Sequence, residues 1–456
     1  MIPRLSRYAR CFQGVIPSGI ATCARDGTPN VTYISQVYFV DDRHVALSCQ
    51  FFNKTRKNLE ENPHAQIELW DPLTFECFRL RVRFLRAETS GPLFEAMALR
   101  IETIASQFGL TGVFKLISAD VCEVTQFEEV EDFIAAGPPA VATIEPEGGP
   151  LTEIRALQTL SARISRASSL DELLTATLDA FQDVFGFGHA MVLVPEGERR
   201  LVTIASRGYG ESGVGAEVAF GEGLIGLVAA EQRLVRVGGA RDLTYGRAVR
   251  ASVVASGGGG GLRPEIPLPG LHDAAAQLAL PLVAQDRLLG VIALESRNAL
   301  AFDEWHEAFL QVIATQVAMA IDRLVDEELD DEEEDLEAAT GELPAVAAPA
   351  PLKLTFYKSD DCVFVGDEYL VRNIPGKILW KLLRAYVGEG RTSFTNRELR
   401  LDPWLGLPEL RDNLESRLIL LRRRLEEKCP QIRTVPAGRG RFTLEVDRPL
   451  ELAERD

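Results

Sequence analysis

The hydrophobic positions of the chain change their spacing twice, and this predicts three regions along the sequence. In the first region apolar and polar residues alternate in short runs between Asp-Gly and Asp-Pro turns, which predicts β-strands. The second region opens with apolar residues three and four positions apart, which predicts helices. Apolar and polar residues then alternate, which predicts strands. The third region mixes both patterns. In the first region we expect strands at 19–24, 31–40, 44–48, 65–70, 75–88 and 119–125, with a helix at 91–108.

The second and third regions are predicted to contain both helices and strands. In the second we expect helices at 154–164, 170–185 and 303–329, strands at 190–194 and 201–206, a glycine turn and helix within 220–237, and a hairpin at 278–296. In the third we expect strands within 354–364, helices at 375–387, 395–401 and 408–428, and a hairpin at 432–446.

Composition supports several domains joined by linkers. The chain has 456 residues, of which 46% are hydrophobic, so it is too long for one ordinary core. A Gly/Pro-rich stretch and an acidic, then Ala/Pro-rich stretch cannot form cores of their own. We therefore expect a multidomain α+β protein. Its predicted parts are a domain at 1–131, a linker at 132–151, a domain at 152–325, a linker at 326–351 and a domain at 352–456.

Charge is distributed unevenly along the chain. The net charge is −18, which argues against nucleic-acid binding over the whole surface. Residues 352–456 hold 20 basic and 17 acidic residues, giving +3 and leaving −21 for the remainder. Eleven acidic residues between Asp326 and Pro351 predict an extended tether, or alternatively an acidic mimic that competes with DNA for the last domain.

Cysteine usage and hydropathy predict a cytoplasmic protein without a membrane partner. The seven cysteines are scattered and form no C-x-x-C pair, so neither a zinc site nor a disulfide framework is expected. The N-terminus lacks the apolar core of a signal peptide, and no window of about 18 apolar residues is found.

The stretch from Ser48 to Pro63, SCQFFNKTRKNLEENP, carries the clearest indication of a ligand. A hydroxyl and several cations lie where a predicted strand gives way to a short helix. Backbone N–H groups, a helix dipole and cationic side chains can converge there on a phosphate. The alternative is an ordinary solvated basic turn.

This region resembles the pyridoxamine 5'-phosphate oxidase-like, FMN-binding split barrels. The resemblance rests on Ala21-Thr22, on Asp26 to Val31, and on Thr55, Lys57, Asn58, Leu59, Asn62 and Pro63, within about the first 125 residues. It implies a split β-barrel that forms a homodimer with FMN at the subunit interface. It also implies that Thr55 and Lys57 bind the FMN phosphate, and that the site includes Ser35, Gln36, Val37, Ser48, Gln50 and Asn58.

Haem is a second cofactor candidate for this domain and is less favoured than FMN. It is considered because related split barrels can hold it. His44 and His64 are its candidate imidazoles. An FMN-dependent oxidoreductase is the alternative function, although no convincing general acid or base accompanies the proposed flavin.

The second region resembles GAF domains, which are small-molecule sensor modules. Gly221-Glu222-Gly223-Leu224-Ile225-Gly226 is similar to that family's glycine turn before a helix, and Leu280-Pro281-Leu282 with Leu289-Gly290-Val291 is similar to its last hairpin. The resemblance implies an α/β sandwich that binds an unidentified small molecule. His189, His272 and His306 share no metal-ligand spacing, so structural or exposed roles are expected for them.

The third region resembles the OmpR-type winged-helix DNA-binding domain of response regulators. LILLRRRL from Leu418 is similar to that family's recognition helix, and IRTVPAGRGRF from Ile432 to its wing. Ile419 and Leu420 stand where the family often has basic residues, so a helix that contacts protein, or a domain that only dimerises, is the alternative. The resemblance implies DNA contacts by Asn413, Ser416, Arg417, Arg422, Arg423, Arg439 and Arg441.

The order of these three modules predicts a one-component transcriptional regulator rather than an enzyme. A flavin or a small molecule would change the arrangement of a dimer through the helix at 303–329, and so reposition two winged helices.

Overall fold

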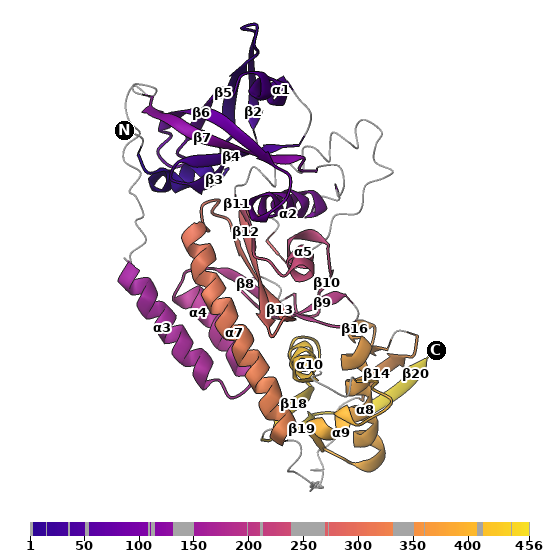
Figure 1. Cartoon of the computed structure of the whole chain (residues 1–456). Helices are drawn as coiled ribbons and strands as arrows, with labels where there is room; N and C mark the ends of the chain where they lie inside the picture. Colours follow the sequence, from indigo (N-terminus) through magenta and orange to yellow (C-terminus); the bar gives the residue numbers. More distant parts are fainter. Residues whose placement is uncertain are drawn as a thin grey trace.

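The computed structural model shows three domains that follow one another along the chain (Figure 1). It describes residues 3–455 with the exception of the following positions: 15, 35–36, 51–53, 108–109, 111–114, 131–149, 198, 210–212, 239–269, 272, 332–350, 360, 408–413 and 439.

The N-terminal domain is built on a seven-stranded antiparallel sheet in the order β2-β1-β5-β6-β7-β4-β3. Burial alternates along β1 and β5, as the sequence pattern predicts for strands with one face in a core. Ile20, Ile67 and Leu80 are fully buried in that core. The elements are η1 (Leu5–Phe12), β1 (Ser18–Cys23), β2 (Pro29–Ile34), β3 (Val37–Asp41), β4 (His44–Cys49), α1 (Lys54–Glu61), β5 (His64–Trp70), β6 (Cys77–Glu88), α2 (Pro92–Gln107) and β7 (Ser118–Glu129).

The central domain has a six-stranded antiparallel sheet in the order β10-β9-β8-β13-β12-β11. Alternate residues of β12 face opposite sides: Leu278 joins the cluster with α3, α4 and α7, and Ala279 joins the cluster with α5. The elements are α3 (Pro150–Arg166), α4 (Leu170–Asp183), β8 (His189–Pro195), β9 (Arg200–Arg207), β10 (Glu217–Ala219), α5 (Gly223–Glu231), β11 (Val235–Gly238), β12 (Ala276–Ala284), β13 (Arg287–Ser296) and α7 (Glu304–Asp331).

The long helix α7 has the length and apolar composition of a membrane span over Trp305–Val325. Half of that segment is buried inside the protein, where Ile313, Val317 and Ile321 pack in the central core. A core helix of a folded domain accounts for this composition.

In its described residues the C-terminal domain combines two small sheets with three helices. One sheet has the order β16-β15-β14-β20 and the other β17-β19-β18. The parallel pairing of β20 with β14 joins the end of the chain to the start of the domain, and this strand was not predicted from the sequence. The elements are β14 (Leu352–Tyr357), β15 (Cys362–Val365), β16 (Glu368–Val371), α8 (Asn373–Glu389), β17 (Ser393–Thr395), α9 (Asn396–Arg400), α10 (Leu414–Lys428), β18 (Ile432–Pro436), β19 (Arg441–Val446) and β20 (Leu450–Arg455).

Candidate functional site

The predicted phosphate turn of the N-terminal domain lies at the start of α1 and is fixed to β1 and β2. Thr55 Oγ1 accepts a hydrogen bond from Asn30 Nδ2 at 3.0 Å. The buried Asn58 donates through Nδ2 to Thr22 Oγ1 at 3.1 Å. Lys57 is 75% exposed, with Nζ 3.9 Å from a Glu61 carboxylate oxygen. An exposed lysine next to an anchored hydroxyl can bind an anion that approaches from solvent.

Arg56 is a second cation near the start of α1, and the sequence analysis gave it no role. Its side chain is 17% exposed and forms an ion pair with Asp120. The guanidinium also donates to Ser118 Oγ at 3.2 Å and lies 5.1 Å from the centre of the Phe84 ring. Because Asp120 already balances its charge, Arg56 connects α1 to β7. Lys57 remains exposed to solvent.

Two of the other predicted flavin residues, Val37 and Ser48, lie on β3 and β4, and Gln50 follows β4. Ser35 and Gln36 lie outside the described residues. Val37 is buried and pairs in register with Leu47, so the side chains of Val37 and Ser48 point to opposite faces of the sheet. Gln50, just after β4, is half-buried. A flavin on one face can therefore contact only one of the Val37 and Ser48 side chains, so the assignment of both stays a prediction.

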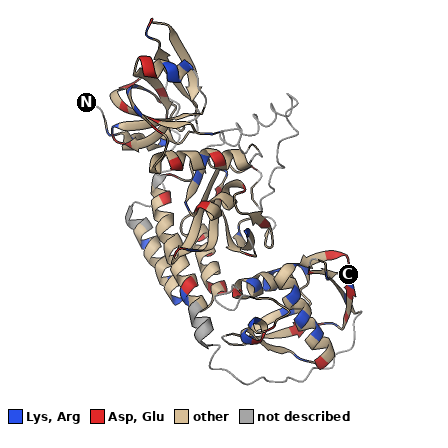
Figure 2. Cartoon of the chain, turned by 45° about the vertical axis from the view of Figure 1, so that its right-hand side comes forward, with Lys and Arg blue, Asp and Glu red and all other residues tan. Residues whose placement is uncertain are grey.

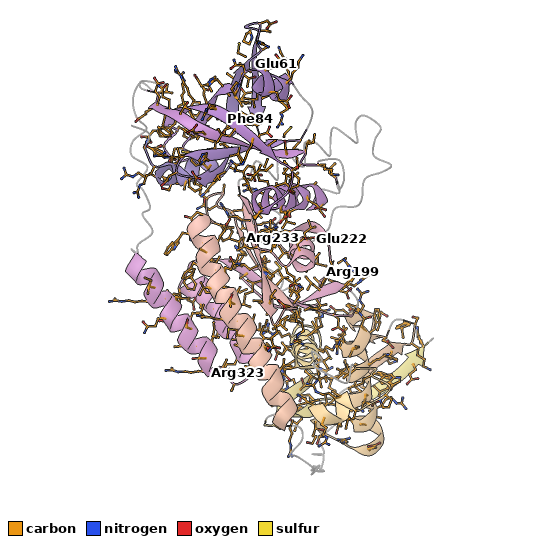
Figure 3. The ribbon with its side chains drawn as sticks, in the orientation of Figure 1. Glu61, Phe84, Arg199, Glu222, Arg233 and Arg323 are labelled. Carbon is orange, nitrogen blue, oxygen red and sulfur yellow. The ribbon has the colours of Figure 1, made fainter. Side chains whose placement is uncertain are left out.

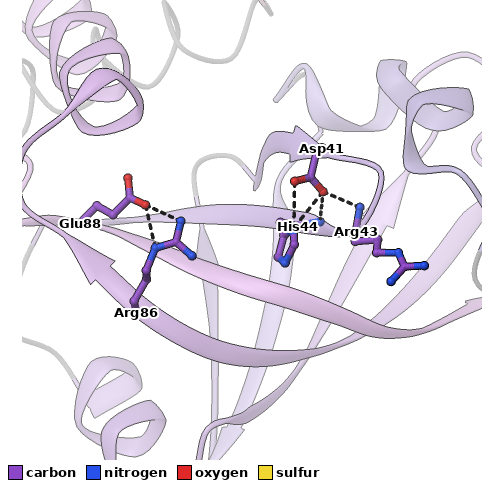
Figure 4. Close-up of polar contacts among 5 residues, drawn as sticks. All are labelled: Asp41, Arg43, His44, Arg86 and Glu88. Atoms are coloured by element: carbon purple, nitrogen blue, oxygen red, sulfur yellow. Dashed lines mark hydrogen bonds and ion pairs between the residues drawn. The ribbon is translucent and has the colours of Figure 1, made fainter.

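The two histidines considered for haem are not brought together. His44 lies on β4, where its Nδ1 is 2.9 Å from Asp41 Oδ1 (Figure 4). His64 lies exposed on β5, which pairs with β1 and β6 rather than with β4. A haem iron could therefore be bound by one of these two imidazoles but not by both.

A buried polar cluster occupies the sheet face of the central domain that α5 also covers. Glu295 on β13 accepts hydrogen bonds from Gln277 Nε2 at 2.6 Å and from Leu271 N at 2.8 Å. Burial raises the pKa of Glu295 despite these hydrogen bonds. The ring of Tyr209 lies 5.4 Å from that of His189, and burial raises the pKa of Tyr209 far above its usual range, with the Glu295 carboxylate adding to the effect.

This cluster gives the central domain a candidate ligand site that the sequence analysis missed. Gln277 is 4% exposed and its Oε1 accepts no hydrogen bond. A buried acceptor of this kind gains free energy when a ligand supplies a donor. A glutamate near the end of an otherwise apolar strand was the available signal in the sequence.

Metal binding has no support in the described part of the chain. No group of three His, Cys, Asp or Glu side chains gathers there. The seven cysteines form no disulfide, and burial raises the pKa of Cys11 and of Cys122 to about 12. His306 has Asp303 beside its ring, and His272 lies outside the described residues.

The helix predicted to read DNA, α10, packs against the central domain (Figure 1). Ile419 and Leu420 are buried in the same apolar cluster as the core of that domain. Arg417 Nε lies 3.0 Å from Glu196 Oε2, and the two side chains are only 7% and 12% exposed. The helix α10 therefore contacts protein, and the surface that it contacts is the central domain of the same chain.

A second arginine of α10 is also bound by the central domain. Arg423 donates to the carbonyl oxygen of Ile204 at 2.9 Å and to Asp171 Oδ1 at 2.8 Å.

Away from α10, Arg372 and Arg200 both contact Glu217 at 2.7 Å. Burial acts to raise the pKa of Glu217, but the two arginines outweigh it and the pKa is lowered.

Two of the remaining predicted DNA contacts, Arg422 and Arg441, line a cavity between the two domains. This cavity has a volume of about 400 Å³ and is lined by Arg422 and Arg441 on one side and by Ser168 and Ser169 on the other. Ser416 is buried. Asn413 and Arg439 lie outside the described residues. Ser416 and Arg417 are buried in this arrangement and so are not accessible to DNA. DNA contact by any of the seven predicted residues stays a prediction.

The N-terminal and central domains also share an interface, formed by α2 and α5. Ser106 Oγ accepts a hydrogen bond from Gly223 N, at the start of α5, at 2.8 Å. Arg233 Nη1 lies 3.1 Å from Glu95 Oε2 across the junction, where Figure 3 labels Arg233. Leu99 and Leu110 belong to the apolar cluster that includes α5. The two domains are therefore packed through a common core.

Comparison with known proteins identifies two of the three domains. Residues 11–114 match the family model described as pyridoxamine 5'-phosphate oxidase, and residues 167–322 match the one described as GAF domain. The chain thus contains a split barrel like that of pyridoxamine 5'-phosphate oxidase followed by a GAF domain, as the two resemblances imply. Neither match reaches the C-terminal domain. A search of curated proteins returns no match.

Solved structures include similar proteins for both regions. A GAF domain of a phosphoenolpyruvate-protein phosphotransferase from Coxiella burnetii is 20% identical, with a TM-score of 0.32, and the match covers 40% of this chain and 99% of that one. An FMN-binding protein from Syntrophomonas wolfei is 19% identical, with a TM-score of 0.24, and the match covers 28% and 86%. HupZ from Group A Streptococcus is 19% identical, with a TM-score of 0.23, and the match covers 28% and 94%.

Proposed function

We propose that this protein is a cytoplasmic, sensor-regulated transcription factor whose C-terminal domain is a winged helix of the OmpR type. The order of elements in its described residues supports this: a four-stranded sheet, three helices, and the β18–β19 hairpin that would form the wing. The C-terminal domain also carries a positive net charge in an acidic chain, and Figure 2 shows blue Lys and Arg positions along the ribbon of its helices.

The observation that carries the proposal is that the GAF domain holds α10. Arg417 and Arg423 are among the side chains expected to contact DNA, and the carboxylates of Glu196 and Asp171 bind them instead. Glu196 lies in the turn between β8 and β9, and Asp171 lies in the first turn of α4. A ligand that binds better to a GAF conformation with these carboxylates displaced would release α10.

We place the sensory input at two sites. In the GAF domain, the cluster of Glu295, Gln277 and Tyr209 would bind a small molecule that carries hydrogen-bond donors. In the N-terminal domain, Thr55 and Lys57 would bind the phosphate of FMN, which supplies redox chemistry when bound. Pairing of two N-terminal domains would place this site at a homodimer interface.

Selection of DNA from a random duplex pool by the full-length protein tests the proposal. We expect enrichment of a sequence motif, and an affinity for it that falls steeply as salt concentration rises. The absence of enrichment, together with steady oxidation of a reduced nicotinamide by the FMN-loaded protein, would instead identify an oxidoreductase with regulatory domains.

A further inference from the structure

A cavity lies where α4 and α7 of the GAF domain face α10 and the β18–β19 hairpin, and is hereafter the interdomain cavity. Its volume of about 400 Å³ is within the range of about 300–1,000 Å³ that is usual for ligand pockets. In Figure 1 the hairpin lies beside the lower end of α7. The Glu295 cluster is on the other face of the GAF sheet, so the interdomain cavity is a separate candidate site.

Two arginines of the C-terminal domain give the interdomain cavity positive charge. Arg422 lies on α10 and Arg441 begins β19, so the fold brings together two cations from different elements. The buried Nε of Arg422 has no acceptor among the described residues. A buried donor of a charged group costs free energy when it has no acceptor, and a ligand oxygen in the cavity would recover that cost.

The two carboxyl groups on the cavity wall do not cancel this charge. Asp171 already binds Arg423, whose Nη2 lies 2.8 Å from Asp171 Oδ1. Glu415 hydrogen-bonds with Asn396, and burial raises the pKa of Glu415 although the charge of Arg422 acts to lower it. A raised pKa makes the neutral carboxyl more accessible, and the neutral form can donate a hydrogen bond to an anion. The interdomain cavity is therefore suited to an anion.

The rest of the wall offers a hydroxyl donor and apolar surface. Ser169 Oγ accepts a hydrogen bond from Glu172 N at 3.3 Å, and its O–H remains able to donate to a ligand. Leu324, Leu418 and Phe442 supply the apolar surface. The matching ligand has an anionic group joined to an apolar part.

The pair of arginines favours phosphate over carboxylate. A phosphate monoester has three terminal oxygens and a charge of about −1.5 to −2, so two guanidinium groups can bind it at once. A carboxylate has two oxygens and a single charge. We propose that the interdomain cavity binds a small phosphate ester, with its phosphate on Arg422 and Arg441 and its apolar part against Phe442.

Such a ligand joins the two domains, because the interdomain cavity exists only while α10 lies on the GAF domain. Its binding free energy adds to the stability of that closed arrangement. DNA would contact the same Arg422 and Arg441, so the ester and DNA exclude each other. This regulatory consequence rests on the proposed function, whereas the binding of the ester does not.

Hydrogen exchange of α10 in the full-length protein, without DNA and at constant ionic strength, tests the site. Titration with inorganic phosphate and with phenyl phosphate should slow this exchange, because both anions stabilise the closed arrangement. Phenyl phosphate should act at lower concentration, since its ring contacts the apolar wall. Arg422→Gln should raise the concentration needed about tenfold or more, because a hydrogen bond to a charged group is lost.

Matched variants separate this site from other anion sites. Arg384→Gln is the control, because Arg384 lies on α8 with its side chain 65% exposed, and this variant should respond as the unmodified protein does. Because the exchange is measured in α10, anion binding at Thr55 and Lys57 does not enter the result. Where Arg422→Gln speeds exchange even without an anion, Arg441→Gln provides the second test, with the same expected loss of response.

Several results would overturn the proposal. Exchange of α10 that neither anion slows would exclude the site, as would a response equally strong in Arg422→Gln and Arg441→Gln. Equal potency of the two anions would exclude the apolar part of the ligand. A protein whose α10 responds as expected but which binds no DNA would retain the site and contradict only the proposed function.

Discussion

Replacing Glu196 by glutamine should release α10 from the GAF domain. The side chains of Arg417 and Glu196 are 7% and 12% exposed, so this is a nearly buried ion pair. Removing one partner of such a pair costs about 3–5 kcal/mol, because the other charge stays buried. Glutamine keeps one hydrogen-bond acceptor, so we take the lower end, about 3 kcal/mol. Since about 1.4 kcal/mol corresponds to a factor of ten, the closed arrangement should lose about a hundredfold in population relative to the open one.

The measurements are hydrogen exchange of α10 and the binding of fluorescent duplex DNA to the full-length protein. We expect faster exchange in α10 and, where the closed arrangement dominates in the unmodified protein, an affinity for DNA that rises by up to about a hundredfold. Glu231→Gln is the control, because Glu231 lies exposed at the end of α5. Unchanged exchange in Glu196→Gln would refute the energetic role of the pair. Faster exchange without a gain in DNA affinity would refute the assignment of α10 to DNA.

Three further outcomes are expected. Gly226→Ala should destabilise the GAF domain by about 1–3 kcal/mol in thermal unfolding, because the added Cβ would lie 2.1 Å from the carbonyl oxygen of Ala219. Because the folded-state pKa of Glu295 is raised, its stabilising contribution is complete below the ordinary pKa of 4.5 and is lost as pH rises through the higher folded-state value. Glu295→Gln should flatten this part of the pH–stability profile. Lys57→Ala should weaken FMN binding, followed by flavin absorbance, while leaving the melting temperature unchanged, because Lys57 is 75% exposed.

Each of these outcomes has a control or a contradicting result. Gly188→Ala should be tolerated, because no atom lies within 4 Å of its added Cβ. A pH profile identical in Glu295→Gln and the unmodified protein would show that Glu295 does not control it. Flavin binding that falls equally in Lys57→Ala and in the β6 variant Arg83→Ala would argue against a specific phosphate contact by Lys57.

Local patterns predicted most of the secondary structure because their causes are local. The expected helix at 170–185 forms as α4, and Ser169 just before it accepts a hydrogen bond through Oγ from Glu172 N at 3.3 Å. The expected strand 31–40 is instead two strands, β2 and β3, on opposite edges of the sheet. The pairing of β20 with β14 joins residues about a hundred positions apart, which no short pattern encodes.

The candidate sites also divide into those set by neighbouring residues and those set by contacts between different elements. The turn with Thr55 and Lys57 was found because its residues are neighbours in sequence. The role of Arg56 was missed because it depends on Asp120, 64 positions away along the chain. Gln277 pairs in register with Glu295 across the β12–β13 hairpin, and the buried contact between them depends on the exact register of that hairpin. Ile419 and Leu420 did carry a signal: apolar side chains at positions that are often basic indicated a protein contact, although not which protein surface.

The sequence by itself determined the charge asymmetry, which follows from composition, and the two family resemblances confirmed here, which rest on short motifs of neighbouring residues. Only the tertiary structure decided that α10 lies on the GAF domain and that Arg422 and Arg441 line a cavity between these two domains. The pairing of Arg417 with Glu196 joins residues 221 positions apart. Such contacts depend on how completed domains fit together, and short-range patterns in the sequence do not specify that fit.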